Sequence, residues 1–262
     1  MTSEPDLVTA GVNLTALLGA VRQAGALIEQ IKSEGVDARY KSDASPVTAA
    51  DEAANAVLVA GLADLYPHLP VISEEDQASH NLAPDDLFFL VDPLDGTREF
   101  IRADSQGAYT VNIGLVQGRH AVGGIVYAPH LDWLCWGGPG RGAWQIKSGQ
   151  LSALAIRSCP PDGPVAVASR SHSDDKTRQF LQRHQIDQTT SIGSSLKFLL
   201  LAAGQADVYP RFAPTMEWDT AAGEAVLAGA GGAVFTPAGA PHLYGKPGWR
   251  NGPFVACGDF AL

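Results

Sequence analysis

The sequence predicts a mixed α/β fold on three observations. The chain has 262 residues, of which 45% are hydrophobic and 18% are charged, a composition typical of a globular protein. Its first part combines helical periodicity with apolar strands that follow one another through short turns, as in an antiparallel sheet. Residues 165–237 instead alternate strand and helix patterns, which is typical of an α/β arrangement.

Two helices are expected near the start of the chain. Residues 12–31 are rich in Ala and Leu, and their apolar residues recur at helical spacing. Residues 49–66 predict a second helix, because Thr48 or Ser45 lies near its start and Pro67 follows its end.

Strands follow these helices. Residues 87–92 predict a buried strand, because five consecutive apolar residues precede Asp92. A Gly-Arg-His turn separates 109–117 from 121–129 and indicates an antiparallel pair. The remaining strands expected in this part lie at 70–76, 131–138 and 142–146.

The pattern changes at CPPDGP, residues 159–164, where we place a boundary. We expect a flexible N-terminus over 1–11, an α+β lobe over 12–158 and an α/β lobe over 159–262. The elements predicted for the second lobe are strands at 165–171, 206–212 and 232–237, and helices at 174–185, 194–205 and 217–231.

Charge and cysteine content narrow the function classes. The chain has 28 acidic and 18 basic residues, and its net charge of −10 has the wrong sign for binding a nucleic-acid backbone. Three cysteines without CxxC spacing argue against a disulfide framework or a zinc site and indicate reduced thiols in a cytoplasmic protein. The acidic N-terminus has no signal-peptide pattern, and the longest apolar stretch, 221–235, contains Glu224 and several glycines and predicts no membrane span.

Acidic residues gather at the predicted ends of elements. Carboxylates that lie together repel one another unless they are protonated or bridged by cations. Mg²⁺ binds through a few carboxylates together with water and substrate phosphate, and two such ions can stabilise a displacement at phosphorus. The candidates are Glu74 and Glu75 after one strand, Asp92 and Asp95 after another, and Asp51 and Asp219 at helix starts.

The segment VDPLDGTREF, residues 91–100, concentrates this chemistry. Pro93 fixes its own φ, so the loop can turn Asp92 and Asp95 toward one point. Gly96 and Thr97 then open a short expected helix, whose backbone N–H groups can bind phosphate at close range. The Thr97 hydroxyl is available to orient water.

Simpler interpretations stay open at this point. A Pro-Asp-Gly sequence is most often only a turn. Asp51 and Asp219 are also suitable as first-turn acids that oppose a helix dipole. The run Glu74–Asp76 is equally typical of a solvated charged segment.

Three motifs in order resemble the inositol monophosphatase superfamily of Mg²⁺-dependent, lithium-inhibited phosphatases: SEE at 73–75, DPLDGT at 92–97 and WDTAAG at 218–223. Other segments are similar to the bacterial 3'(2'),5'-bisphosphate nucleotidases of this superfamily, and the resemblance covers nearly the whole chain from about residue 12. It implies a layered αβαβα sandwich of the inositol monophosphatase and fructose-1,6-bisphosphatase type. The similar segments are 42–54, 109–116, 126–129, 168–172, 189–198 and 209–227.

The resemblance implies the metal ligands residue by residue. Asp51 and Thr97 would activate the attacking water, and Glu74 would share in catalysis. Arg98 stands where the family commonly has lysine. Two or three Mg²⁺ ions would be held by Glu74, Asp92, the Leu94 carbonyl, Asp95 and Asp219.

The resemblance also implies contacts to a nucleotide. A 3',5'-bisphosphate has two anionic ends, and the metal ions neutralise only one, so the 5'-phosphate needs cations such as Lys197 and Arg211. Two alternatives stay open: Lys197 as a surface lysine with a buried stem, and Arg211 as a partner of Asp207 or Glu217. The implied contacts are Gly96, Thr97, His172, Ser194, Lys197, Arg211 and Asp219.

By resemblance, the protein is expected to convert 3'-phosphoadenosine 5'-phosphate to AMP and phosphate in sulfate assimilation, without a covalent phosphoenzyme. The alternatives are an inositol or sugar monophosphatase of the same superfamily, or a catalytically silent regulator that binds nucleotide or metal. The expected partner is a small nucleotide, with no nucleic acid and no disulfide-linked partner. Oligomeric state is left open, as is peripheral association with the cytoplasmic side of the inner membrane.

Overall fold

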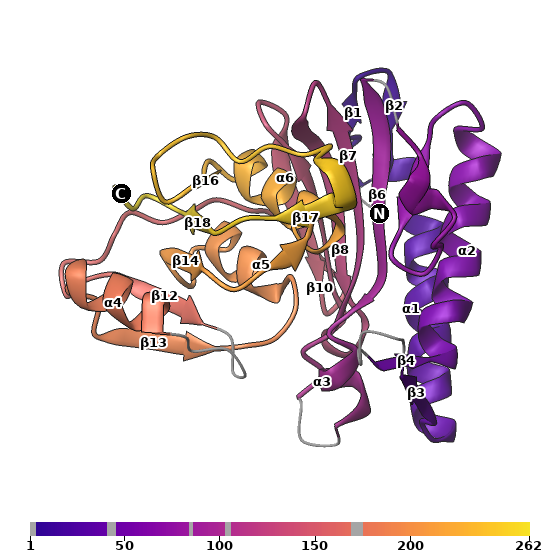
Figure 1. The fold of residues 1–262 in the computed structure, drawn as a ribbon, viewed down its shortest axis with the longest axis horizontal. Coiled ribbons are helices and arrows are strands. Elements are labelled where there is room, and N and C mark those ends of the chain that lie inside the picture. The colour runs from indigo at the N-terminus through magenta and orange to yellow at the C-terminus, as the bar shows by residue number, and fades with distance from the viewer. Residues whose placement is uncertain (1–3, 41–45, 84–85, 103–105, 169–174) are drawn as a thin grey trace.

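The computed structural model describes residues 4–40, 46–83, 86–102, 106–168 and 175–262. Figure 1 shows its elements stacked in layers: a helix pair, a seven-stranded sheet, a second helix pair, a five-stranded sheet and an outer helix. This order confirms the predicted α/β fold class and its αβαβα layering. The helices of these layers are α1 (Leu18–Glu34) and α2 (Ala49–Leu65), then α5 (Leu196–Ala202) and α6 (Ala221–Gly229), and finally α4 (Asp175–Arg183). A short helix, α3 (Thr97–Ile101), follows strand β6 (Leu87–Asp95).

The N-terminal helix begins later than the sequence predicts. Val12–Asn13 form a strand, β2, that pairs with β1 (Val8–Thr9), and a 3₁₀ turn (Leu14–Leu17) precedes α1. The Asn13 side chain accepts a hydrogen bond from the Thr15 N–H at 3.1 Å, so it caps the 3₁₀ turn and stops helical backbone from extending upstream. Leu7, which lies in the segment expected to be flexible, is fully buried in the hydrophobic core that also contains the buried side chains of α1 and α2.

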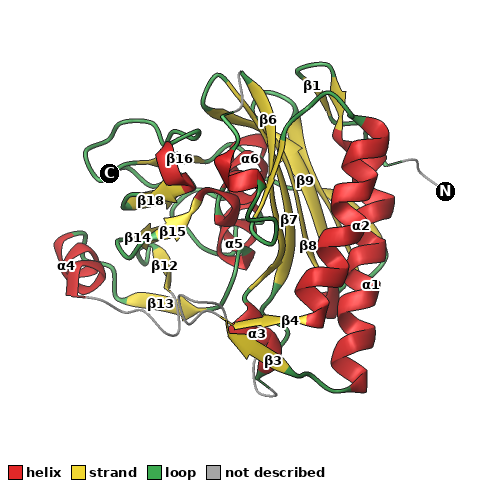
Figure 2. Cartoon of the chain, turned by 45° about the vertical axis from the view of Figure 1, so that its right-hand side comes forward, coloured by secondary structure: helices red, strands yellow, loops and turns green. Residues whose placement is uncertain are grey.

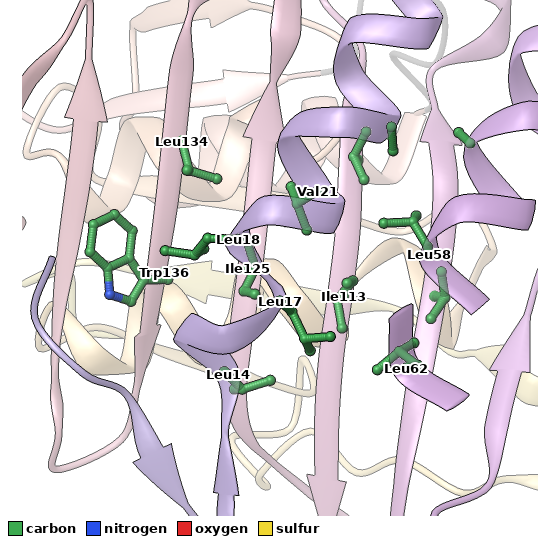
Figure 3. Close-up of a cluster of buried hydrophobic side chains, with 14 of the residues drawn as sticks. Leu14, Leu17, Leu18, Val21, Leu58, Leu62, Ile113, Ile125, Leu134 and Trp136 are labelled. Atoms are coloured by element: carbon green, nitrogen blue, oxygen red, sulfur yellow. The ribbon is translucent and has the colours of Figure 1, made fainter. Parts of the chain in front are cut away.

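Helices α1 and α2 lie side by side across one face of the first sheet (Figure 2). The core between them is built from Leu, Ile and Val side chains, and Figure 3 shows Leu17, Val21, Leu58 and Leu62 directed at Ile113 and its neighbours on the strands. Each such side chain contributes about 1.5–3 kcal/mol when it is fully buried. This packing holds the start of α2, where Asp51 lies, at a fixed height above the sheet.

The first sheet has the order β11-β10-β9-β8-β7-β6-β5. Strand β6 is parallel to β5 and antiparallel to β7. It runs to Asp95 rather than ending at Asp92, and a register shift separates Asp92, opposite Asn112, from Asp95, opposite Thr110. The strands are β5 (Val71–Ser73), β6 (Leu87–Asp95), β7 (Thr110–Gln117), β8 (His120–Ala128), β9 (Trp133–Gly138), β10 (Gly142–Lys147) and β11 (Gln150–Ala153).

Helix α6 lies unusually close to the opposite face of this sheet. A Cβ atom at Gly114 of β7 would lie 2.6 Å from the Ala221 Cβ, and one at Gly124 of β8 would lie 2.3 Å from the Ala222 oxygen. Only glycine leaves room for the helix backbone at these two positions. The close approach brings Asp219, just before α6, to the end of β6.

The second sheet has the order β13-β12-β14-β18-β16, with α4 on its outer side (Figure 1). The two sheets fall on either side of 154–164, but α6 lies in sequence between strands of the second sheet and packs on the first. The division into two lobes at residue 159 therefore stays a prediction. The strands are β12 (Val165–Ala168), β13 (Gln188–Ser191), β14 (Val208–Arg211), β16 (Ala233–Phe235) and β18 (Phe254–Cys257).

Two further features bear on the expectations from composition. Among the described residues, no helix is both long and apolar enough to cross a bilayer. Cys135 and Cys257 are buried free thiols, and Cys159 is an exposed one.

Candidate active site

Three carboxylates from separate segments meet at the carboxyl ends of β5 and β6. Oxygen atoms of Glu74, Asp92 and Asp219 all lie within 4.8 Å of one another. Glu74 directly follows β5, and its N–H donates to the Val91 oxygen at 3.1 Å. Asp219 ends the 3₁₀ turn Glu217–Asp219, where its Oδ2 accepts from the Met216 N–H at 2.8 Å. We call these three residues the carboxylate cluster.

The electrostatics of the carboxylate cluster indicate a cation site. Burial, with repulsion from Glu74, Asp95 and Asp219, raises the pKa of Asp92 well above its usual range. Burial and repulsion from Asp95 and Glu74 raise the pKa of Asp219 in the same direction. A bound divalent cation would relieve this repulsion, and an all-oxygen donor set is the one that Mg²⁺ prefers.

Asp95 lies beside the carboxylate cluster rather than in it. Its Oδ2 accepts from the Ser195 hydroxyl at 2.9 Å, and the Asn112 Nδ2 lies 3.5 Å away. Asp95 also lines the adjoining pocket, so its carboxylate faces both the predicted metal ions and the substrate side.

Leu94 is buried between the two aspartates. Its N–H donates to the Asp92 Oδ1 at 3.1 Å, and its carbonyl lies 3.2 Å from the Thr97 hydroxyl. The structure therefore places the carbonyl predicted as a ligand next to the hydroxyl predicted to orient water.

Asp51 and Thr97 are in direct contact. The Thr97 hydroxyl lies 3.0 Å from the Asp51 Oδ1, while the Asp51 Oδ2 accepts from the Thr48 N–H and hydroxyl at 2.7 Å each. Thr48 and Asp51 form a capping box at the start of α2. Strand β4 (Pro46–Thr48) directly precedes α2 and lies beside α3 (Figure 2). Both interpretations of Asp51 thus describe its geometry: one carboxylate oxygen caps the helix and the other meets Thr97.

The backbone conformation at position 96 requires a glycine. Its φ of +92° is in the left-handed region, and an added Cβ would lie 2.9 Å from the Ala108 oxygen. From this turn the short helix α3 (Thr97–Ile101) begins, as the sequence predicts.

A pocket with three basic side chains in its lining, which we call the cationic pocket, adjoins the carboxylates. Lys197 is only 6% exposed, so it is no surface lysine. Its Nζ donates to the Ser194 oxygen at 2.6 Å, and burial lowers its pKa to about 8. The pocket is lined by Asp95, Gly96, Arg98, Glu99, Gly193, Ser194, Lys197, Phe198, Tyr209, Arg211, Thr215, Asp219 and Thr220.

Arg211 is not paired with either acid that the sequence offered. Asp207 pairs with Arg157 at 2.7 Å, and Glu217 pairs with Lys246 at 2.7 Å. The Arg211 Nε is buried and has no hydrogen-bond partner among the described residues. An anionic ligand in the pocket would supply one.

The predicted site residues differ from those seen in the structure in two respects. His172, a predicted substrate contact, lies outside the described residues. Ser195 and Asn112 were given no role, yet both are buried and contact one another and Asp95. The available signal was a polar Asn within the otherwise apolar strand TVNIGLV.

The carboxylate cluster, the left-handed glycine turn and the cationic pocket together suit a site that binds phosphate esters and metal cations. The family model described as the inositol monophosphatase family matches residues 12–253. The chain is 46% identical over 216 residues to the 3'(2'),5'-bisphosphate nucleotidase CysQ of Salmonella typhimurium, covering 81% of this chain and 86% of the relative. It is 45% identical over 226 residues to the protein of the same name from Escherichia coli K12, covering 85% and 90%.

A solved structure extends the comparison. The crystal structure of CysQ from Bacteroides thetaiotaomicron superposes with a TM-score of 0.79 at 34% identity, covering 94% of this chain and 97% of the other. The chain therefore belongs to the inositol monophosphatase family of metal-dependent phosphatases, and within it to the CysQ-type bisphosphate nucleotidases.

Proposed function

We propose that the protein hydrolyses the 3'-phosphate of 3'-phosphoadenosine 5'-phosphate and releases AMP and phosphate. One observation carries this proposal: the carboxylate cluster, with Asp92 buried in it, adjoins a pocket whose cationic side chains include Lys197 and Arg211. A substrate with two phosphates matches both halves, because metal ions neutralise one phosphate and side-chain cations the other. The 3'(2'),5'-bisphosphate nucleotidase activity named for the relatives supports the same substrate.

The metal ions in this proposal are two or three Mg²⁺ per site. When bound, Mg²⁺ supplies charge stabilisation to the transferring phosphoryl group and acidifies the attacking water. The repulsion among buried carboxylates supports a site of this kind. The ligands would be Glu74, Asp92, the Leu94 carbonyl, Asp95 and Asp219.

Asp51 and Thr97 handle the proton. The Thr97 hydroxyl donates toward Asp51, so the lone pairs of its oxygen are free to accept from the attacking water. The proton lost by the water can then pass through this hydroxyl to Asp51, a carboxylate whose pKa is raised by burial. No side chain needs to become phosphorylated in this scheme.

The remaining predicted contacts hold the nucleotide. Lys197 and Arg211 would bind the 5'-phosphate, and the Gly96 turn lets the 3'-phosphate approach the backbone. Ser194 lines the same pocket. His172 stays a predicted contact to the nucleotide. The cytoplasmic location and the role in sulfate assimilation also stay predictions.

The test is phosphate release with Mg²⁺ from 3'-phosphoadenosine 5'-phosphate, AMP and inositol 1-phosphate side by side, each with and without lithium. We expect fast, lithium-sensitive release from the bisphosphate alone. Faster release from inositol 1-phosphate would move the protein to a monophosphatase role. No release from any ester by Mg²⁺-loaded protein would favour the silent regulator.

A further inference from the structure

One buried hydroxyl joins the parts of the site. Ser195 is 1% exposed and lies directly before α5. Its Oγ lies 2.9 Å from the Asp95 Oδ2, 3.0 Å from the Asp219 main-chain oxygen and 3.1 Å from the Asn112 Nδ2. Strand β6, strand β7 and the segment before α6 therefore meet at a single side-chain atom.

The directions of these bonds follow from the chemistry of the groups. An ionised carboxylate and a carbonyl only accept, so the single Ser195 hydrogen is shared between Asp95 and the Asp219 oxygen. The Asn112 amide donates to the Ser195 oxygen, and its Nδ2 also faces Asp95 at 3.5 Å. Asp95 can offer nothing but acceptors, and this fixes the orientation of the amide.

Two unsatisfied atoms lie along the same strand. The Asn112 Oδ1 and the Thr110 Oγ1 are buried and have no partner among the described residues. Asn112 lies opposite Asp92 and Thr110 opposite Asp95, so both side chains share a face of the sheet with these carboxylates. A buried polar atom without a partner is unfavourable, and ordered water around a bound cation would supply the missing hydrogen bonds.

We propose that Ser195, supported by Asn112, is a positioning residue that sets the Asp95 carboxylate and the Asp219 backbone at the separation that Mg²⁺ binding requires. This inference rests on the proposed metal-dependent phosphatase function. Lys197 follows Ser195 by two residues in the same turn, so the hydroxyl also fixes the distance between the carboxylates and the cationic pocket. Hydrogen-bond partners of metal ligands commonly change metal affinity or activity by about 10–100-fold when they are lost.

The test compares wild type with Ser195→Ala, with Ser195→Cys, which keeps the shape of the side chain but replaces the hydroxyl with a larger and weaker donor, and with Ile28→Val as a control. Ile28 is buried in the hydrophobic core on α1, and removing one methylene group there lowers the thermal midpoint without touching the site. Mg²⁺ binding is measured by calorimetry on the substrate-free protein. Thermal midpoints, and kcat and KM for the best phosphomonoester, complete the comparison.

We expect Mg²⁺ affinity to fall at least tenfold in Ser195→Ala and by an intermediate amount in Ser195→Cys, with kcat reduced and the control unchanged. A merely structural serine would lower the thermal midpoint like Ile28→Val and leave Mg²⁺ affinity within twofold of wild type, which would overturn the proposal. If Ser195→Ala does not fold, wild-type affinity in Ser195→Cys overturns it and reduced affinity supports it.

Failure of the proposed function gives a different result. A wild-type protein that binds Mg²⁺ and cleaves another ester but not 3'-phosphoadenosine 5'-phosphate would reject the substrate, while the comparison of Mg²⁺ affinities would still decide the role of Ser195. A wild-type protein with no affinity for Mg²⁺ would overturn both.

Discussion

The candidate active site has an acidic half, made of the carboxylates, and a basic half in the adjoining pocket. The two halves carry opposite charge and are built differently. The acidic half combines residues at the ends of β5 and β6 with Asp219 from the 3₁₀ turn before α6, and its carboxylates accept hydrogen bonds from the Met216 and Leu94 N–H groups and the Ser195 hydroxyl. The basic half consists of Lys197 on a short helix and Arg211 at the end of β14. Lys197 donates to main-chain oxygens, and Arg211 keeps an unpartnered Nε.

The difference shows what each half requires from its ligand. Asp92 in the acidic half and Lys197 in the basic half are buried near groups of like charge, an arrangement that is unfavourable until opposite charge arrives. In the proposed reaction, metal ions would occupy the acidic half before a phosphate enters it, so the geometry of this half would have to be set in advance. The basic half would meet only the substrate, and its long side chains can adjust to it.

The largest expected effect breaks the acidic half. Asp95→Asn should lower kcat at least about 100-fold at saturating Mg²⁺, because a predicted ligand loses its charge, whereas loss of a supporting partner alone costs about 10–100-fold. The fold should survive, since the change also removes repulsion with Asp92 and Asp219. Phosphate release at increasing Mg²⁺ checks this, with the exposed Asp76→Asn as the matched control. Unchanged turnover in folded Asp95→Asn would remove Asp95 from the ligand set.

The basic half should respond to a different change. Arg211→Ala should raise KM for 3'-phosphoadenosine 5'-phosphate by about 10- to 100-fold, because a charge-assisted hydrogen bond contributes about 1.5–3 kcal/mol. Adenosine 3'-phosphate lacks the 5'-phosphate, so its KM should change little. Arg183→Ala on α4 is the control. Equal losses on both substrates would show that Arg211 does not read the 5'-phosphate.

The pH dependence of KM sharpens the role of Lys197. Its pKa is lowered to about 8 in the free protein, so the cation that attracts phosphate is lost as the pH rises through this value. We expect KM for the bisphosphate to rise several-fold between about pH 7 and pH 10, and to stay flatter in Lys197→Arg, whose guanidinium keeps its charge. A wild-type profile identical to that of Lys197→Arg would contradict this assignment.

The smallest expected effect is on the stability of the acidic half without metal. The pKa values of Asp92 and Asp219 are raised in the folded state, so the folded protein binds protons more tightly than the unfolded chain there. Without Mg²⁺ their contribution to stability is therefore fully present below about pH 4, the ordinary Asp pKa, and is lost as the pH rises through the raised values. Saturating Mg²⁺ at neutral pH should raise the thermal midpoint by on the order of 5–10 °C. Thermal scans with and without chelator measure both, and an Mg²⁺-insensitive midpoint at neutral pH would contradict them.

Local signals in the sequence were sufficient for much of the fold. Thr48 and Pro67 bound α2 as the sequence predicts, and the apolar run from Leu87 marks β6. The order of the motifs pointed to the αβαβα layering before any contact was known. The predicted start of the first helix at residue 12 was wrong, because a side chain there competes with helical backbone. Asn13 caps a 3₁₀ turn, so α1 begins at Leu18.

For the site, the amino-acid sequence is enough to identify the charged residues and the turn that needs a glycine, because residue type and neighbouring residues decide both. Which charges meet depends on the packing of the folded chain. The sequence allowed Asp207 or Glu217 to pair with Arg211, but in the structure Asp207 pairs with Arg157 and Glu217 with Lys246. Ser195 gained its contacts because α5, β7 and the segment before α6 converge on one point. Such convergence depends on the packing of whole layers, which no local pattern of residues encodes.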